Sequence, residues 1–303
     1  MNKKKILVVG GTGFIGSNLI NRLKSSHWNI TSISTRIPTG KKKLKKVNYI
    51  KVDISKKKQL ELKVKKKYDC IVNFGGYVDH SNKVKTYQSH FVGCKNLVNL
   101  FKKKFPKKFI QLGSSLEYGN IKSPLKESFS CKPNSIYGKS KLLATNYLVN
   151  SKVFNKSSII ILRLFQAYGP RQETNRLIPH VIDKCIQNKK FNCTSGTQRR
   201  DFIYIDDLID LIILCLKNKN NTNGIFNVGS GKPKKIKYII NYIKNYLKKG
   251  KPQFGKIKMR KDESLELYPS IKEVTKIFKW KPKTELELGL NKTIKYFKKN
   301  EKK

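Results

Sequence analysis

The stretch "SIYGKSK" contains a tyrosine and a lysine at the spacing of an acid–base pair. Tyr137 and Lys141 are four residues apart, so a helix that begins here carries both side chains on one face. A phenol with an ordinary pKa, about 10, exchanges protons poorly at neutral pH, and a neighbouring ammonium lowers that pKa by stabilising the phenolate. The spacing therefore predicts that Tyr137 exchanges a proton with a substrate and that Lys141 makes this exchange feasible.

A second chemical motif is the glycine-rich stretch "ILVVGGTGFIG" near the N-terminus. It places Gly10, Gly13 and Gly16 where a predicted strand meets a predicted helix. Glycines at such a junction allow a tight turn, and the free N–H groups and positive helix end can hold a pyrophosphate. We therefore predict a dinucleotide site here, with Phe14 and Ile15 contributing to it.

The residues after the second and third predicted strands indicate which dinucleotide is bound. The second strand ends in "ISTRIP", where Ser34, Thr35 and Arg36 offer two hydroxyls and a guanidinium, with no carboxylate to repel a 2′-phosphate. This favours NADP (NADPH), with NAD as the alternative. Asp53 and Ile54, after the third strand, are predicted to contact the cofactor, Asp53 through the adenine amino group; a turn-forming Asp53 is the competing interpretation.

The elements that must position these residues alternate along the first half of the chain. Short β-branched runs are each followed by an amphipathic stretch, a pattern that predicts an α/β, Rossmann-like doubly wound parallel sheet. We expect residues 1–165 to form an NAD(P)-binding Rossmann domain, to which the chain returns within about 193–218. Residues 166–303 are expected to be mainly a smaller C-terminal substrate-binding lobe. The predicted strands are 5–9, 30–34, 47–52, 69–74, 108–113 and 158–164.

Composition narrows the class of protein further. The 303 residues include 67 Lys and Arg against 19 Asp and Glu, a net charge of +48, but the lysines are spread along the whole chain without a recognition signature for nucleic acid. The six cysteines include no CxxC pair, which favours reduced thiols in a cytoplasmic protein. The apolar runs are too short to span a membrane. We therefore expect no specific nucleic-acid partner, no membrane partner and no metal site.

Several motifs together resemble one family. The stretches "GGTGFIG", "GSSLEYG", "YGKSK", "RLFQAYGP", "RDFIYIDDL" and "FNVGSG" resemble the extended short-chain dehydrogenase/reductases, the NAD-dependent epimerase/dehydratase family that acts on nucleotide sugars. This resemblance implies that Ser114 completes a Ser–Tyr–Lys triad with Tyr137 and Lys141. It also implies that Lys141 binds the nicotinamide ribose, that a hydride moves between the nicotinamide and a sugar carbon, usually C4, and that the protein is a homodimer.

The same resemblance implies which residues bind a nucleotide-diphosphate sugar. Ser115 would shape the sugar pocket, and Gln166 stands where relatives often have an asparagine that reaches the sugar or phosphate. Asn175 precedes the "RLIP" helix and could contact the nucleotide sugar. Arg200 and Arg260 resemble the arginines that hold the diphosphate, where a guanidinium can bind in a bidentate manner.

Departures from the sequence patterns of individual subfamilies reduce the number of reactions that this chain is expected to catalyse. The 4,6-dehydratases carry Asp and Glu directly after the triad hydroxyl, whereas this chain has Ser115 and Leu116, with Glu117 next to them. The fucose-synthase type has a cysteine and a histidine where this chain has Leu116 and Arg171. The best prediction is reduction of a nucleotide 4-keto-6-deoxy sugar at C4. The alternatives are a 4-epimerase that retains NAD, then a 4,6-dehydratase or a non-catalytic NADP sensor.

One further departure concerns a helix in the first half of the chain. His90, in "HFVGCKNL", replaces the asparagine that is usual in this segment of the family. A single histidine in an amphipathic helix is more often a packing residue than a catalyst. We therefore assign it no role from the sequence.

Overall fold

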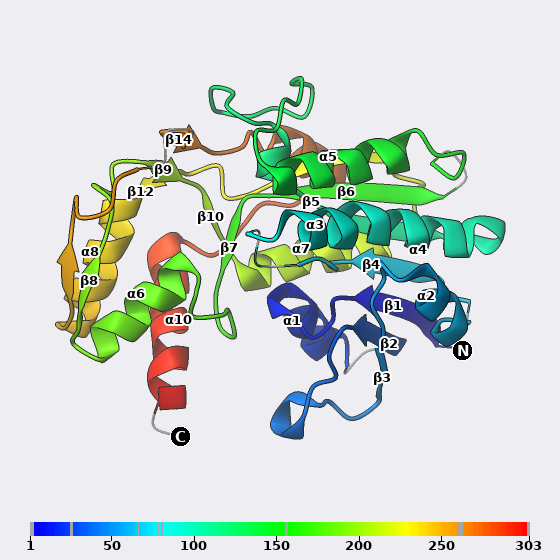
Figure 1. Cartoon of the computed structure of the whole chain (residues 1–303), viewed down its shortest axis with the longest axis horizontal. Helices are drawn as coiled ribbons and strands as arrows, with labels where there is room; N and C mark the ends of the chain where they lie inside the picture. Colours follow the sequence, from blue (N-terminus) through cyan, green and yellow to red (C-terminus); the bar gives the residue numbers. More distant parts are fainter. Residues whose placement is uncertain are drawn as a thin grey trace. The chain divides into compact units, whose positions relative to one another are not determined.

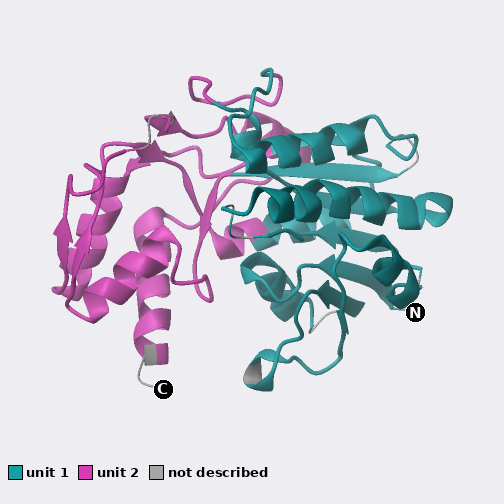
Figure 2. Ribbon diagram, viewed as in Figure 1, with its two compact units in different colours: residues 1–119, 129–164, 209–226 teal, residues 120–128, 165–208, 227–303 magenta. Residues whose placement is uncertain are grey.

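The computed structural model describes residues 3–24, 27–65, 67–77, 79, 81–154, 157–259 and 263–301. The chain divides into two compact units, each of which is discontinuous in the sequence (Figure 2). Unit 1 comprises Met1–Gly119, Phe129–Leu164 and Ile209–Phe226, and unit 2 comprises Asn120–Ser128, Phe165–Leu208 and Asn227–Lys303.

Unit 1 is built on a seven-stranded sheet in the order β11-β6-β5-β4-β1-β2-β3 (Figure 1). The ladders from β3 through β6 are parallel. This is the strand order of the doubly wound dinucleotide-binding fold, so the predicted fold class is confirmed. The strands are β1 (Lys4–Val9), β2 (Trp28–Ser34), β3 (Val47–Lys51), β4 (Cys70–Asn73), β5 (Lys108–Ser114), β6 (Ser158–Leu164) and β11 (Gly224–Val228).

Helices cover both faces of this sheet because right-handed crossovers in opposite directions place their helices on opposite faces. Alternate strand residues such as Leu7, Ile71 and Ile159 point to one face, where they share a core with Leu97 and Leu148 from two crossover helices. The helices of unit 1 are α1 (Phe14–Leu23), α2 (Lys57–Lys63), α3 (Lys83–Tyr87), α4 (Gly93–Phe101) and α5 (Ile136–Val149), with most of α7 (Ile205–Lys217), the π-helix η2 (Gln88–Val92) and the 3-10 helices η1 (Gly40–Lys42), η3 (Lys102–Lys104) and η4 (Ser115–Glu117).

The sheet order also determines where a ligand can bind. From β1 the chain passes to β2 on one side, while β4 lies on the other side of β1, so the winding direction reverses between β1 and β4. Ligands of open parallel sheets bind beyond the carboxyl ends of the strands at such a reversal. The glycine turn follows the carboxyl end of β1, and Ser114 and Ser115 lie at the carboxyl end of β5.

Unit 2 combines small sheets of two or three short strands with amphipathic helices. Its helices α6 and α8 pack together through buried residues that include Val181, Ile182, Ile239 and Ile243. Asp201, fully buried, accepts hydrogen bonds from the backbone and hydroxyl of Ser230 and ties two of its loops. The elements are β7 (Gln166–Tyr168), β8 (Lys190–Asn192), β9 (Arg199–Arg200), β10 (Phe202–Tyr204), β12 (Lys234–Lys235), β13 (Lys251–Gln253), β14 (Glu266–Leu267), α6 (Leu177–Ile186), α8 (Ile236–Leu247), α9 (Lys272–Phe278) and α10 (Leu286–Glu301).

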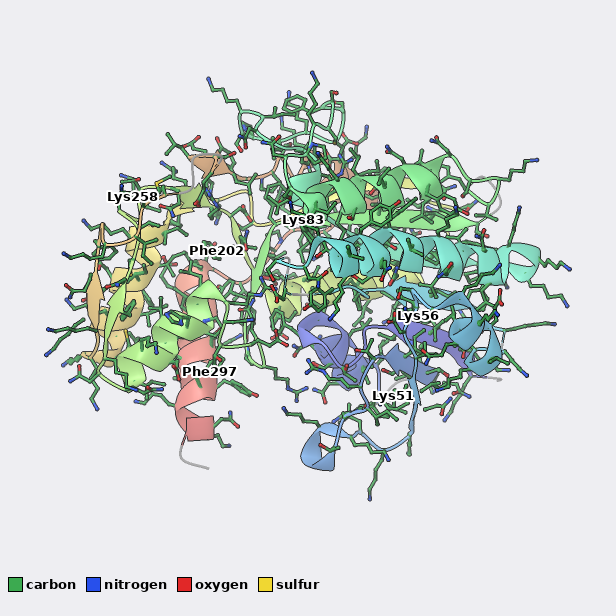
Figure 3. The ribbon with its side chains drawn as sticks, viewed as in Figure 1. Lys51, Lys56, Lys83, Phe202, Lys258 and Phe297 are labelled. Carbon is green, nitrogen blue, oxygen red and sulfur yellow. The ribbon has the colours of Figure 1, made fainter. Side chains whose placement is uncertain are left out.

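The basic side chains extend from many different elements. Figure 3 labels Lys51 in β3, Lys56 at the start of α2, Lys83 in α3 and Lys258 after β13, and all four are exposed. The excess of lysine is therefore carried by both units rather than by one helix or strand.

Within the described part of the chain, no helix combines the length and the apolar character needed to cross a membrane.

Candidate active site

The glycine turn after β1 leaves no room for side chains at two of its positions. Gly10 has φ of 75°, which favours glycine, and a Cβ there would lie 3.0 Å from the carbonyl carbon of Phe74. A Cβ on Gly16, in the first turn of α1, would overlap the carbonyl oxygen of Gly10. The turn and helix therefore pack backbone to backbone, and Gly13 caps a helix that has no acidic residue in its first turn. This end of α1 is suited to an anion.

The ends of neighbouring strands hold the glycine turn in place. Ser34, the last residue of β2, accepts a hydrogen bond at Oγ from the backbone N–H of Thr12, with a distance of 3.3 Å. Thr35 and Arg36 follow it and are exposed. Phe14 and Ile15 are half-buried at the start of α1. The structure thus groups most of the predicted cofactor residues around one turn, and their binding roles stay predictions.

Asp53 and Ile54 have local structural roles. Oδ1 of Asp53 accepts hydrogen bonds from the backbone N–H and the hydroxyl of Ser55, at 2.9 and 2.7 Å, which is the turn-forming arrangement weighed as the competing interpretation. Ile54 is 7% exposed and belongs to the core of unit 1. The contact of Asp53 with adenine and the contact of Ile54 with the cofactor stay predictions.

Ser114 ends β5 and begins the short helix η4. Its Oγ accepts a hydrogen bond from the backbone N–H of Leu116 at 3.2 Å, and its own N–H donates to Oε1 of Glu117 at 2.8 Å. This reciprocal arrangement is a capping box, which fixes the chain direction at the strand end. Ser114 and Ser115 are both buried, with exposed fractions of 6% and 3%.

Glu117 forms a buried ion pair beneath this turn. Its Oε2 accepts hydrogen bonds from Nε of Arg163 and from the hydroxyl of Thr145, both at 2.9 Å. Glu117 is fully buried and the side chain of Arg163 is 3% exposed. Burial opposes the charge of Arg163, but Glu117 and Tyr118 outweigh that effect and raise the pKa of Arg163 above its usual range. Both carboxylate oxygens are engaged inside unit 1, which favours a structural role for Glu117 over proton abstraction.

Tyr137 and Lys141 lie in the first turns of α5. The helix is capped by Ser135, whose hydroxyl accepts from the backbone N–H of Gly138 at 3.1 Å. Nζ of Lys141 is 5.8 Å from the ring centroid of Tyr137 and donates to the carbonyl of Leu112 in β5 at 2.7 Å. The ammonium is buried and paired with a carbonyl, so it is held beside the phenol ring.

Gly138 brings this helix close to the serine turn. A Cβ at this position would overlap the carbonyl oxygen of Leu116, so any other residue would push α5 away from η4. The absence of a side chain lets the segment that carries Tyr137 pack directly on the segment that follows Ser114. The structure therefore assembles all three predicted triad residues on adjoining segments of unit 1.

The predicted substrate residues are distributed differently. Ser115 belongs to unit 1, whereas Gln166, Asn175 and Arg200 belong to unit 2, and Arg260 lies outside the described residues. Gln166 begins β7 and is exposed, and Asn175 is exposed in the loop before α6. Their contacts with a substrate stay predictions.

Arg200 carries an anionic partner of its own. Its Nη2 lies 2.7 Å from Oε1 of Glu263, and the two side chains are 11% and 25% exposed. Burial lowers the pKa of Arg200 from its usual value, and Glu263 partly offsets this effect.

Among the residues that the structure describes, no group of His, Cys, Asp and Glu side chains is arranged to hold a metal ion.

The position of His90 beside Tyr137 was not predicted from the sequence. His90 is 6% exposed, and its ring meets the ring of Tyr137 edge to face, with the centroids 4.9 Å apart. The sequence signal was its replacement of the usual asparagine, which we interpreted as packing. The structure places that replacement in contact with the predicted proton donor.

The sheet order and the glycine turn at its reversal point define a dinucleotide-binding class of protein. A model of the NAD dependent epimerase/dehydratase family matches residues 6–229. The chain belongs to this family, which confirms the resemblance inferred from its motifs. It is therefore an enzyme of the nucleotide-sugar epimerase/dehydratase class.

Individual relatives support the same assignment over nearly the whole chain. The chain is 27% identical over 311 residues to a putative UDP-glucose 4-epimerase of Methanocaldococcus jannaschii, covering 97% of this chain and 99% of that protein. It is 27% identical over 303 residues to CDP-abequose synthase of Salmonella muenchen, covering 96% and 97%. The solved structure of UDP-glucuronic acid 4-epimerase from Bacillus cereus, in complex with UDP-glucuronic acid and NAD, has a TM-score of 0.85 at 26% identity, covering 98% and 99%.

Proposed function

We propose that this chain is an NAD(P)-dependent nucleotide-sugar oxidoreductase that reduces the keto group of a nucleotide 4-keto-6-deoxy sugar at C4. The observation that carries the proposal is the arrangement of Tyr137 and Lys141 on α5, packed through Gly138 against the turn that follows Ser114. This arrangement supplies a proton donor, a cation and a second hydroxyl within one unit.

Ser114, Tyr137 and Lys141 each have a different role in the proposed reduction. When bound, a reduced nicotinamide supplies the hydride. The hydroxyl of Ser114 donates a hydrogen bond to the sugar carbonyl oxygen, and Tyr137 delivers the proton that converts the developing oxyanion into an alcohol. Lys141 stabilises the phenolate that Tyr137 leaves behind, since its ammonium is held 5.8 Å from the ring centroid.

The surroundings of Ser114 disfavour dehydration. A 4,6-dehydratase needs an acid and a base directly after the triad hydroxyl, and the chain has Ser115 and Leu116 there. Glu117, the nearest carboxylate in sequence, is fully buried and bonded to Arg163 and Thr145. Proton removal by Glu117 would require breaking a buried ion pair, which is energetically costly.

A 4-epimerase that retains NAD is the second candidate. It is supported by the similarity to a putative UDP-glucose 4-epimerase and to a solved UDP-glucuronic acid 4-epimerase. Such an enzyme would use Tyr137 twice, first to remove the proton of the C4 hydroxyl and then to return it. The two candidates differ in whether the cofactor must leave after each turnover.

The proposed preference for NADP is supported by the end of β2. Ser34 and Thr35 carry hydroxyls, Arg36 is exposed beside them, and no carboxylate follows the strand where an NAD-specific site usually has one. A guanidinium binds a phosphate through charge-assisted hydrogen bonds. We therefore propose that Arg36 binds the 2′-phosphate.

Arg36→Ala should weaken NADPH binding about tenfold to a hundredfold, the range expected for loss of a hydrogen-bonded charge, and change NADH binding by less than about twofold. Fluorescence titration of both nucleotides measures this. Lys102→Ala, which removes another exposed cation of unit 1, controls for the overall positive field. Equal weakening of NADPH and NADH by Arg36→Ala would contradict the 2′-phosphate assignment.

Turnover assays test the reaction itself. Purified protein is mixed with NADPH and 4-keto-6-deoxy sugars linked to CDP, dTDP, GDP or UDP, and the reduced-nicotinamide absorbance is followed. We expect its loss with one of these sugars, in step with formation of the 4-hydroxy product. Interconversion of UDP-glucose or UDP-glucuronic acid without added cofactor would instead establish the epimerase. Binding of NADPH with no turnover in either assay would favour the non-catalytic sensor.

A further inference from the structure

The helix that carries His90 changes its winding at that residue. Residues Gln88–Val92 form a π-helix, η2, between α3 and α4, and this segment packs against α5. A π-helical turn accommodates one more residue than an α-helical turn, and such turns are frequent at functional sites. In this turn, two consecutive side chains, Ser89 and His90, contact the backbone of the same residue.

That residue is Tyr77, in the segment that follows β4. The backbone N–H of Tyr77 donates to Oγ of Ser89 at 2.9 Å, and the Nε2 atom of His90 lies 3.1 Å from its carbonyl oxygen. A carbonyl oxygen only accepts, so Nε2 of His90 carries the proton of this hydrogen bond. The π-helix thus holds Tyr77 on both of its backbone polar groups.

The same segment supports the glycine turn. A Cβ on Gly76 would overlap the imidazole of His90, so the ring lies directly against the backbone there. Two residues earlier, the carbonyl group of Phe74 lies 3.0 Å from where a Cβ of Gly10 would be. A continuous set of backbone contacts therefore runs from His90 through residues 74–77 to the proposed cofactor turn.

The imidazole also contacts the ring of the predicted proton donor. The rings of His90 and Tyr137 are 4.9 Å apart with an interplanar angle of 82°. Aromatic rings favour this edge-to-face geometry, which restricts how the tyrosine ring can tilt. Tyr137 is therefore oriented by the His90 ring as well as by its own helix.

We propose that His90 is a positioning residue with two separable functions. Its ring orients Tyr137 for proton transfer, and its Nε2–H group holds residues 74–77 against the glycine turn for cofactor binding. This inference deepens the proposed oxidoreductase function and rests on it. Neither function requires His90 to touch the substrate.

Two substitutions separate these functions. His90→Gln keeps a donor at about the distance of Nε2 and removes the ring, so kcat should fall about tenfold while the dissociation constant for NADPH changes by less than about twofold. His90→Phe keeps the ring and removes the donor, so NADPH binding should weaken about threefold to tenfold, with a smaller loss of kcat than in His90→Gln. NADPH titration and steady-state kinetics at saturating NADPH measure the two effects.

Two further variants serve as checks. Ser89→Ala removes the other hydrogen bond to Tyr77 without altering the ring contact, so it should reproduce the weaker NADPH binding even if His90→Phe folds poorly. His180→Gln makes the same chemical change in α6, where the ring of His180 meets Phe191 with centroids 6.2 Å apart, and should leave both measurements near wild type.

A residue that only fills space would not produce this pattern, in which His90→Gln mainly lowers kcat and His90→Phe mainly weakens NADPH binding. Losses of kcat and NADPH affinity in the same proportion in both His90 variants, or no change in either, would overturn the proposal. If wild-type protein reduces none of the sugars, the proposed function fails by itself. The NADPH titrations still decide the inference in that case, since equal dissociation constants for His90→Gln and His90→Phe would contradict it.

Discussion

Tyr137→Phe should lower kcat by about two to four orders of magnitude, the usual contribution of a positioned acid–base group. The substitution removes only the hydroxyl, so the ring contact with His90 is kept. NADPH affinity should therefore change by less than about threefold, because the packing around the glycine turn is undisturbed. The measurements are steady-state turnover with NADPH and the nucleotide 4-keto-6-deoxy sugar, and titration of NADPH.

The same helix offers a matched control for this variant. The hydroxyl of Tyr147, also in α5, donates to Asn99 at 2.9 Å in an exposed position. Tyr147→Phe makes the identical change away from Lys141 and should retain turnover within about twofold of wild type. Activity that survives in Tyr137→Phe would show that another group donates the proton.

The second large effect is on stability. Glu117→Gln should lower the free energy of unfolding by about 3–5 kcal/mol, because it leaves the buried guanidinium of Arg163 without its counter-charge. Turnover should fall as well, since Glu117 also accepts from the backbone N–H of Ser114 at 2.8 Å. Urea unfolding followed by circular dichroism gives the free energy.

An exposed ion pair provides the comparison. Arg22 and Asp210 lie 2.8 Å apart with exposed fractions of 46% and 47%, so Asp210→Asn should cost less than about 1 kcal/mol. The double variant Glu117→Leu/Arg163→Met, which replaces the buried pair by apolar groups, should recover much of the stability lost in Glu117→Gln. A cost for Glu117→Gln no larger than that of Asp210→Asn would show that the buried pair contributes little.

Features fixed by short stretches of sequence were predicted well. The central strands of unit 1, such as β1, β4 and β6, could be located because they are buried on both faces and therefore read as continuous apolar runs, as in Ile6–Val9. The predicted segment 69–74 differs from β4 (Cys70–Asn73) only at its ends. The glycine turn was recognisable because its backbone contacts exclude side chains at Gly10 and Gly16.

Features that depend on distant contacts were not predictable. From the sequence, Glu117 was considered as a catalytic residue for dehydration. Its ion pair with Arg163 could not be predicted, because Arg163 is 46 residues away in the sequence. The short strands of unit 2, such as β9 and β10, contain two or three residues and exist only through pairing with remote segments. The contact of His90 with Tyr137 depends on a local π-helical turn, which no residue pattern in that stretch indicates.

The most direct test of the account is a single-turnover reaction with NADPH that carries deuterium at the transferable position. The protein is mixed with the nucleotide 4-keto-6-deoxy sugar that it reduces, and the product is analysed by mass spectrometry and NMR. Our account predicts one deuterium bound to C4 of the product sugar with wild-type protein, and formation of the same product about two to four orders of magnitude more slowly with Tyr137→Phe. A product without deuterium at C4, or no oxidation of the added NADPH, would contradict reduction by this enzyme.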